Sequence, residues 1–227
     1  MSSAGRLGGE VSGIRVDVDR WRQQIPGDAW PEGLPGTGEL WRRDVFALAD
    51  GWRAGRVSAR EMLTVACMWG YGLRGYGPAR TLAALDDDRD GAKLEYNLGM
   101  LRRQDPSEDD LAAAYQRFSR GSRTRLYRLG PAFFTKLLYF SGYRRGAGGV
   151  QPLILDSRVA GNLPPDAGGA GRRSWGWPAA DWICFLRWAA VQARRPAFGG
   201  EADAVEMALF TGRWEPGPPP APALSGR

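Results

Sequence analysis

The sequence predicts an all-α fold, and three features support this prediction. Apolar residues recur at three- and four-residue steps along several stretches, which is the spacing of one face of a helix. Serine, aspartate and proline stand where these stretches begin, as they do at helix N-termini. Hydrophobic residues make up 43% of the 227 residues, enough for a substantial core. We therefore expect one helical domain over residues 14–214.

The helices are expected in the following order. Residues 16–25 should form a strand or a short helix, and residues 39–54 have the period of an amphipathic helix. Ser58 and Glu61 form a capping box, which should begin a mostly apolar helix. Further helical stretches are expected over residues 59–69, 78–85, 92–103, from 107 onward, from 131 onward, 157–163, 179–195 and 201–210.

The two ends of the chain differ from this helical region. Residues 1–13 are small and polar and residues 215–227 are rich in proline, so we expect both segments to be disordered. No apolar run approaches the roughly 18 residues of a membrane span, and the N-terminus lacks a signal-peptide core. Cys67 and Cys184 stand in apolar helical runs and are predicted to be buried thiols of a reducing compartment. We expect a cytoplasmic protein.

Composition excludes several kinds of site. The chain has no histidine, which excludes histidine-based catalytic triads and most zinc sites. Residues 86–91 (D-D-D-R-D-G) match the first half of a calcium loop, but Asn97 stands where the loop needs its final glutamate. We interpret these acids as helix caps and expect neither a metal nor an organic cofactor. A net charge of +6 favours a polyanionic partner.

Lys136 is the most informative single residue. Of 31 basic residues only Lys93 and Lys136 are lysines, and an arginine cannot act as an amine nucleophile. Gly130-Pro131 should begin a helix in which Lys136 lies on an apolar face, which favours the neutral amine. Lys136 is thus either a candidate nucleophile or a lysine whose charged end reaches out from a core helix to water.

Asp156 stands twenty residues further on. It follows an apolar run at residues 152–155 and precedes a short predicted helix, so it should be the N-cap of that helix.

Together these features resemble the helix-hairpin-helix DNA glycosylases. The sequence Leu129-Gly130, then Thr135-Lys136, then an apolar run ending in Asp156 at a helix start is most similar to the 8-oxoguanine DNA glycosylase branch. The resemblance covers residues 127–163, with the hairpin motif at about 107–142. Ala132 occupies the place of the second hairpin glycine, and Thr-Lys follows two residues later than usual.

The resemblance implies a fold, an activity and a set of roles. The fold would be the two-lobed, all-α glycosylase fold, and Lys136 would attack C1′ of a flipped-out modified nucleotide with Asp156 assisting. The activity would be excision of a modified base, oxidised guanine being suggested, with possible strand nicking. It would serve base-excision repair or defence against modified foreign DNA. We expect a monomer that acts on double-stranded DNA in the nucleoid.

Contacts to DNA and to the base are expected from further residues. The glycine-rich stretch 69–80 and the basic run 117–128 lie where they could hold phosphates. The expected DNA-binding residues are Arg74, Arg80, Arg123, Arg125, Arg128, Gly130 and Thr135. The expected base-pocket residues are Phe134, Trp182 and Phe185. A non-catalytic DNA-binding module, in which Lys136 only contacts phosphate, is the alternative.

Overall fold

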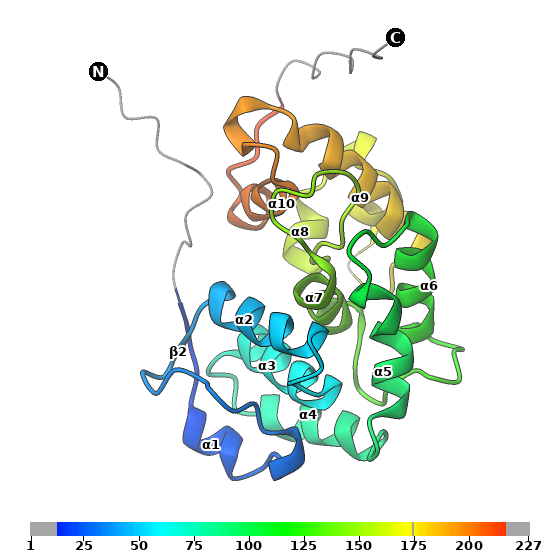
Figure 1. Ribbon diagram of the computed structural model, residues 1–227. Helices are drawn as coiled ribbons and strands as arrows, with labels where there is room; N and C mark the ends of the chain where they lie inside the picture. Colours follow the sequence, from blue (N-terminus) through cyan, green and yellow to red (C-terminus); the bar gives the residue numbers. More distant parts are fainter. Residues whose placement is uncertain (1–12, 174, 217–227) are drawn as a thin grey trace.

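A computed structural model describes residues 13–173 and 175–216 of the chain (Figure 1). Within these residues there are ten α-helices and only one small sheet, which confirms the all-α prediction. The expected disordered segments fall almost wholly on residues 1–12 and 217–227, which lie outside the described residues.

The lower group of elements in Figure 1 comes from the first part of the chain. Its strands pair antiparallel, with Ile14 opposite Leu40. Its elements are β1 (Ile14–Arg15), α1 (Val18–Arg22), the 3-10 turn Gly27–Ala29, β2 (Glu39–Leu40), α2 (Arg42–Arg53), α3 (Ala59–Tyr71) and α4 (Gly77–Asp86). Helix α3 is the centre of this group, because it packs on α2, α4 and α7 and buries ten of its residues.

The upper group is formed by the end of the chain, and helix α7 (Pro131–Gly142) lies between the two groups (Figure 1). The upper elements are α8 (Ser157–Gly161), α9 (Ala179–Ala193), α10 (Ala202–Thr211) and the 3-10 turns Pro165–Ala167, Gly169–Arg172 and Pro196–Phe198. Helix α6 (Glu108–Phe118) packs against α7, which also packs against α2 and α3, and α5 (Ala92–Leu98) packs against α3 and α6. Helix α7 itself carries apolar residues on nearly all sides, and nine of its 12 residues are buried.

The predicted helix caps are present. Ser58 Oγ accepts from Glu61 N at 3.2 Å, and Glu61 Oε2 accepts from Ser58 N at 2.7 Å, which completes the capping box. The carboxylate of Asp88 accepts from the backbone N–H groups of Lys93 and Leu94 at 3.0 and 2.9 Å. This acid therefore caps α5, and no cluster of potential metal ligands is found among the described residues.

Several sequence-based boundaries were wrong. Residues 39–40 form β2, and α2 begins only at Arg42. The helix expected over residues 92–103 ends as an α-helix at Leu98 and continues as a 3-10 turn from Gly99, where glycine disfavours the α-helix. Cys67 is buried as expected, but Cys184 is exposed on α9. In the described part of the chain no helix is long and apolar enough to cross a bilayer.

Candidate active site

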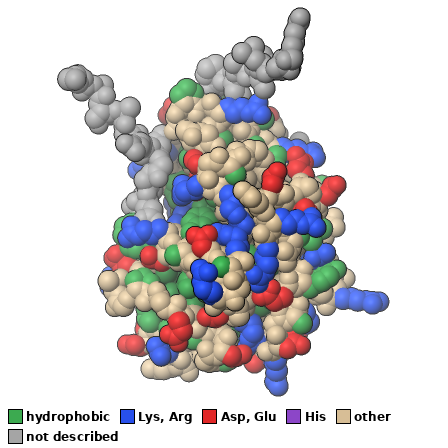
Figure 2. Space-filling model, in the orientation of Figure 1, with side chains coloured by type: hydrophobic (Ala, Val, Ile, Leu, Met, Phe, Trp, Pro, Cys, Tyr) green, Lys and Arg blue, Asp and Glu red, His purple; other side chains and the backbone are tan. Residues whose placement is uncertain are grey.

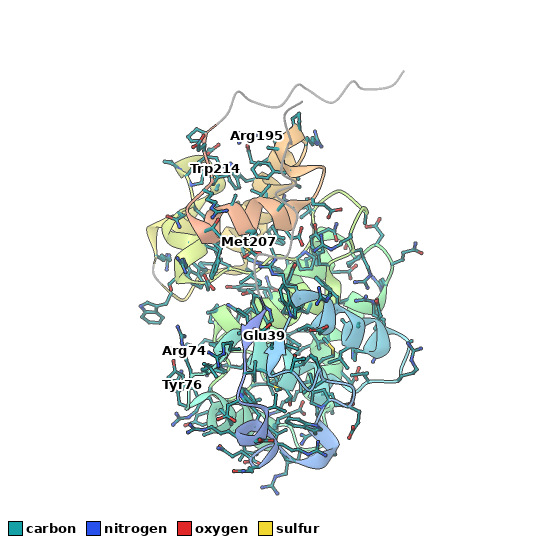
Figure 3. The ribbon with its side chains drawn as sticks, turned by 90° about the vertical axis from the view of Figure 1, so that its left-hand side faces the viewer. Glu39, Arg74, Tyr76, Arg195, Met207 and Trp214 are labelled. Carbon is teal, nitrogen blue, oxygen red and sulfur yellow. The ribbon has the colours of Figure 1, made fainter. Side chains whose placement is uncertain are left out.

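A cavity of about 400 Å³ lies between the lower and upper groups, where α7 meets α10. In Figure 3, Arg74 of the lower group and Met207 of the upper group lie on opposite sides of this space. Figure 2 shows hydrophobic and basic side chains gathered between the two groups on the face of Figure 1. The volume is within the usual range of small-molecule sites, roughly 300–1,000 Å³.

Lys136 projects from the second turn of α7 into this cavity. Its side chain is only 9% exposed. The ammonium donates to the carbonyl oxygen of Ala132 at 2.9 Å and to Asp156 Oδ2 at 3.0 Å. Its stem lies against Gly70 of α3, where an added Cβ would be 3.0 Å from Lys136 Cδ. A glycine at this position thus leaves the space that the lysine needs.

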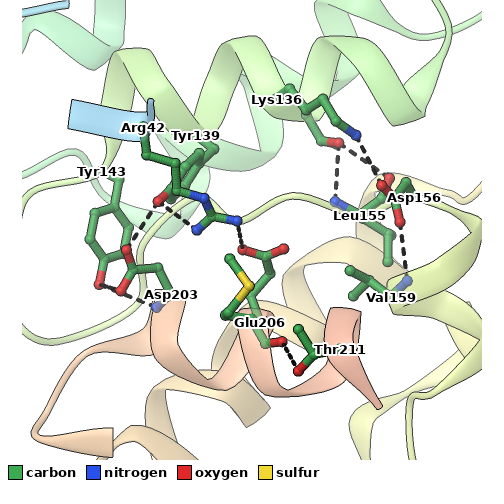
Figure 4. A network of polar contacts seen from close by, with 12 residues as sticks. Arg42, Lys136, Tyr139, Tyr143, Leu155, Asp156, Val159, Asp203, Glu206 and Thr211 are labelled. Carbon is green, nitrogen blue, oxygen red and sulfur yellow. Dashed lines mark hydrogen bonds and ion pairs between the residues drawn. The ribbon is translucent and has the colours of Figure 1, made fainter. Parts of the chain in front are cut away.

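Asp156 is held at the N-terminus of α8. Its Oδ1 accepts from the backbone N–H groups of Arg158 and Val159, both at 3.1 Å, while Oδ2 faces Lys136 (Figure 4). Burial by itself raises the pKa of this carboxyl, but the Lys136 ammonium and the two helix N–H groups outweigh burial. The pKa therefore lies below the ordinary value. The carboxylate is ionised at neutral pH and is oriented from both sides.

The opposite wall of the cavity contains a network of buried charges (Figure 4). Arg42 of α2 pairs with Glu206 of α10 at 3.0 Å and donates to the hydroxyl of Tyr139 at 3.1 Å. Tyr139 in turn donates to Asp203 Oδ2 at 3.0 Å, and Arg145 pairs with the same oxygen at 3.1 Å. Burial raises the pKa of Glu206, and pairing with Arg42 only partly offsets this effect. One end of the cavity therefore offers fixed donors and acceptors.

Aromatic rings and a methionine complete the cavity. Phe133 of α7 and Phe210 of α10 both line it, as do Trp69 and Met207. Phe133 stacks on Tyr71 with ring centroids 3.9 Å apart, and Arg158 lies over the Phe210 ring at 4.8 Å. These flat apolar surfaces next to polar groups suit a planar heterocycle.

Most of the expected DNA-binding residues lie at the surface. Arg74 is exposed and lines the cavity, and Arg80 is exposed on α4. Arg123, Arg125 and Arg128 are exposed in the loop between α6 and α7, and Gly130 at the end of that loop is the N-cap of α7.

Thr135 has a different environment from the one expected. It is fully buried, and its hydroxyl bonds to backbone groups of Pro131 and Leu155. A DNA phosphate has no access to it. Thr135 faces inward because it lies in the buried part of α7. The exposed residues of the motif lie in the loop before this helix.

The three expected base-pocket residues do not line the cavity. Phe134 stacks on Phe118, Trp182 Nε1 donates to the carbonyl of Leu153 at 3.0 Å, and Phe185 is wholly buried in α9. All three are core residues, because the apolar face of α6 packs against both α7 and α9 there.

The cavity is lined instead by residues of α2 and α10 that were not expected from the sequence. Arg42, Glu206 and Phe210 line the cavity. One signal was present in the sequence: Asp203 and Glu206 stand three residues apart in an otherwise apolar helix. Acidic side chains are seldom buried unless they have a polar or charged partner.

Comparison with known families found a match. The model of the family described as "Putative 8-oxoguanine DNA glycosylase OGG-like protein" matches residues 9–210. Searches of curated proteins and of solved structures found no match. The family match spans nearly the whole chain and includes every residue that lines the cavity except Thr211. The chain therefore belongs to the OGG-like family of DNA glycosylases.

Proposed function

We propose that this protein excises a modified base from double-stranded DNA, with Lys136 as nucleophile and Asp156 as its acid–base partner. The observation that supports this most directly is the contact of 3.0 Å between the two side chains, both nearly buried and both lining one cavity. The target nucleotide would be turned out of the duplex so that its base enters the cavity.

Asp156 is placed well to move protons for Lys136. It takes a proton from the ammonium, and the neutral amine forms a bond to C1′ while the glycosidic bond breaks and its electron pair leaves with the base. The departing base receives the proton that Asp156 had taken. A second proton passes from the Lys136 nitrogen to O4′ as the sugar ring opens, which leaves a Schiff base. Water then hydrolyses the Schiff base and restores the lysine.

The base itself would lie between the rings of Phe133 and Phe210. Arg42 and Glu206 would face its polar edge, the guanidinium as donor and the carboxylate as acceptor. A base with both an exocyclic oxygen and adjacent N–H groups, such as an oxidised guanine, matches this pair. An adenine-type edge also presents an acceptor next to a donor amino group and can pair with both side chains, so a comparison of lesion duplexes has to distinguish the two kinds of base.

The basic loop between α6 and α7 would hold the DNA backbone. Its arginines are exposed, and the loop leads directly into the N-terminus of α7, whose dipole favours phosphate.

Borohydride trapping tests the nucleophile directly. Incubation with a duplex that contains 8-oxoguanine, followed by reduction, should yield a covalent protein–DNA adduct, because reduction fixes the Schiff base. Lys136→Arg should abolish the adduct and retain DNA binding, since arginine keeps the charge but lacks the amine. Asp156→Asn still caps α8, so the protein should fold while the excision rate falls on the order of 10²–10⁴-fold.

Lys93→Arg is the matched control, because Lys93 is the only other lysine and pairs with Asp87 at 3.1 Å outside the cavity. It should trap DNA like the wild type. A panel of duplexes with other lesions covers the case in which 8-oxoguanine is not the substrate. Binding without adduct or base release on every duplex would favour the non-catalytic DNA-binding module instead.

A further inference from the structure

The hydroxyl of Thr135 joins the two segments that supply Lys136 and Asp156. Thr135 is fully buried on α7, and its Oγ1 donates to the carbonyl of Pro131 at 2.7 Å, one turn earlier. The same oxygen accepts from the backbone N–H of Leu155 at 3.1 Å. The carbonyl of Leu155 also lies 3.2 Å away, so both polar groups of this residue surround the hydroxyl.

These contacts fix the register of two pairs of neighbours. Thr135 precedes Lys136 along α7, and Leu155 precedes Asp156 along the extended segment that leads into α8 (Figure 4). With Thr135 bonded to Leu155, the next residue of each segment lies beside the other. The Lys136 amine is therefore 3.0 Å from the Asp156 carboxylate. The hydroxyl thus acts on the backbone, one residue away from each reacting group.

The orientation of Asp156 depends on this backbone contact. Its Oδ1 is held by N–H groups of α8, so the carboxylate moves together with the start of that helix. Trp182 anchors the other end of the extended segment through the carbonyl of Leu153. Without the Thr135 hydroxyl, the segment between Leu153 and α8 would lose its hydrogen bond to α7 next to the reacting pair.

We propose that Thr135 is a positioning residue for base excision: it holds the Asp156 carboxylate in register with the Lys136 amine. This inference rests on the proposed function of the Lys136–Asp156 pair. A displacement of about 1 Å between reacting groups can reduce a rate on the order of 10²-fold. A single buried hydroxyl therefore has a measurable effect without touching the substrate.

Thr135→Val tests the proposal, because valine keeps the shape and removes the hydroxyl. With the 8-oxoguanine duplex, or the best substrate of the panel, the single-turnover rate should fall about tenfold or more while the affinity for DNA stays unchanged. Thr135→Ser keeps the hydroxyl and should stay within about threefold of the wild type on the same argument. The acidic limb of the pH–rate profile should move to higher pH in Thr135→Val, because the Lys136 ammonium helps to lower the pKa of Asp156.

Thr81→Val is the matched control for loss of a buried helical hydroxyl. Thr81 Oγ1 donates to the carbonyl of Gly77 at 3.0 Å, again one turn earlier, but lies on α4 outside the cavity. It should leave the excision rate and the pH profile unchanged. Thr135→Cys, with a weaker hydrogen-bonding group, serves if valine prevents folding and should give an intermediate rate.

The outcomes separate the two proposals. A wild-type rate and profile in Thr135→Val would overturn the positioning role alone. So would a failure of both Thr135→Val and Thr135→Cys to fold, because the hydroxyl would then serve the fold. Absence of base release by the wild type on every duplex would overturn the proposed function and this inference together.

Discussion

At the scale of single residues, the site is organised by backbone caps as much as by side chains. Asp156 is both the N-cap of α8 and the ionic partner of Lys136, one oxygen serving each role. Gly70 contributes by having no side chain, since a Cβ there would press on Lys136 and Phe133. Each of these positions is constrained by local geometry and by the site at once.

Arg128 has an energetically unfavourable backbone conformation. Its φ of 59° is the only positive value at a non-glycine position in residues 13–173 and 175–216. The left-handed region costs such a residue about 1–2 kcal/mol, which exceeds the entropic cost of glycine, about 0.5–1 kcal/mol. The backbone conformation thus disfavours this exposed arginine, and we expect its side chain to contact DNA.

Arg128→Gly should therefore stabilise the protein and weaken DNA binding. Urea unfolding should show a free energy of unfolding higher by up to about 1 kcal/mol, and the log–log salt slope of DNA affinity should fall by about one unit. Arg123→Gly, in the same loop but without a positive φ, should weaken binding without the gain in stability. An Arg128→Gly variant that binds DNA like the wild type would remove this arginine from the interface.

At the scale of secondary-structure elements, α10 forms the wall of the cavity opposite α7. One face of this helix carries Asp203, Glu206, Met207 and Phe210 into the cavity, at three- and four-residue steps. The helix is tied to α2 by the Arg42–Glu206 pair and to α7 by the bond from Tyr139 to Asp203. A helix from the end of the chain thus supplies the residues that would recognise the base.

Phe210→Ala should reduce discrimination between damaged and undamaged DNA. Stacking on an aromatic ring contributes about 1–3 kcal/mol per base, so affinity for the lesion duplex should fall while affinity for an undamaged duplex stays constant. Phe198→Ala removes a buried ring just before α10 that does not line the cavity, and it should lower stability without changing discrimination. Competition binding between lesion and undamaged duplexes measures this discrimination for both variants. An equal loss of discrimination in the two variants would mean that the base does not stack on Phe210.

At the scale of the whole molecule, some arginines are bonded inside the fold while others are exposed to solvent. The net charge is +6, yet several arginines are engaged inside the fold, such as Arg42 with Glu206 and Arg60 with the carbonyls of Leu85 and Asp88. The arginines of the α6–α7 loop remain exposed beside the N-terminus of α7. Charges at this loop, rather than the net charge, should govern DNA binding.

The double variant Arg123→Ala, Arg125→Ala should flatten the salt dependence of DNA affinity by up to about two units of log–log slope, since each phosphate contact contributes nearly one unit. Arg56→Ala, Arg194→Ala removes the same charge at exposed sites outside the loop and should leave the slope nearly unchanged. Binding measured from low to moderate salt distinguishes the two. Equal slopes in both variants would mean that only net charge matters.

The sequence by itself determined the all-α class and several of the helix starts, such as those capped by Ser58 and Asp156 and the one at Pro131. These features depend on local chemistry: apolar periodicity, a proline at the first helical position, and side chains that cap helices. The spacing of twenty residues between the lysine and the aspartate, taken with the family resemblance, was enough to expect the pair. The structure brings the two side chains into contact at 3.0 Å, and their chemical roles belong to the proposed function.

Only the tertiary structure decided which apolar residues form the core and which line the cavity. Phe134 and Phe133 are neighbours on one helix with the same chemistry, yet Phe134 is buried against Phe118 while Phe133 faces the cavity. Arg42 and Glu206 lie 164 residues apart and meet because α2 packs on α7 and α10 is hydrogen-bonded to α7 through Asp203 and Tyr139. Such assignments depend on how helices distant in sequence pack, because the hydrophobic effect is non-directional and rewards burial on any apolar face.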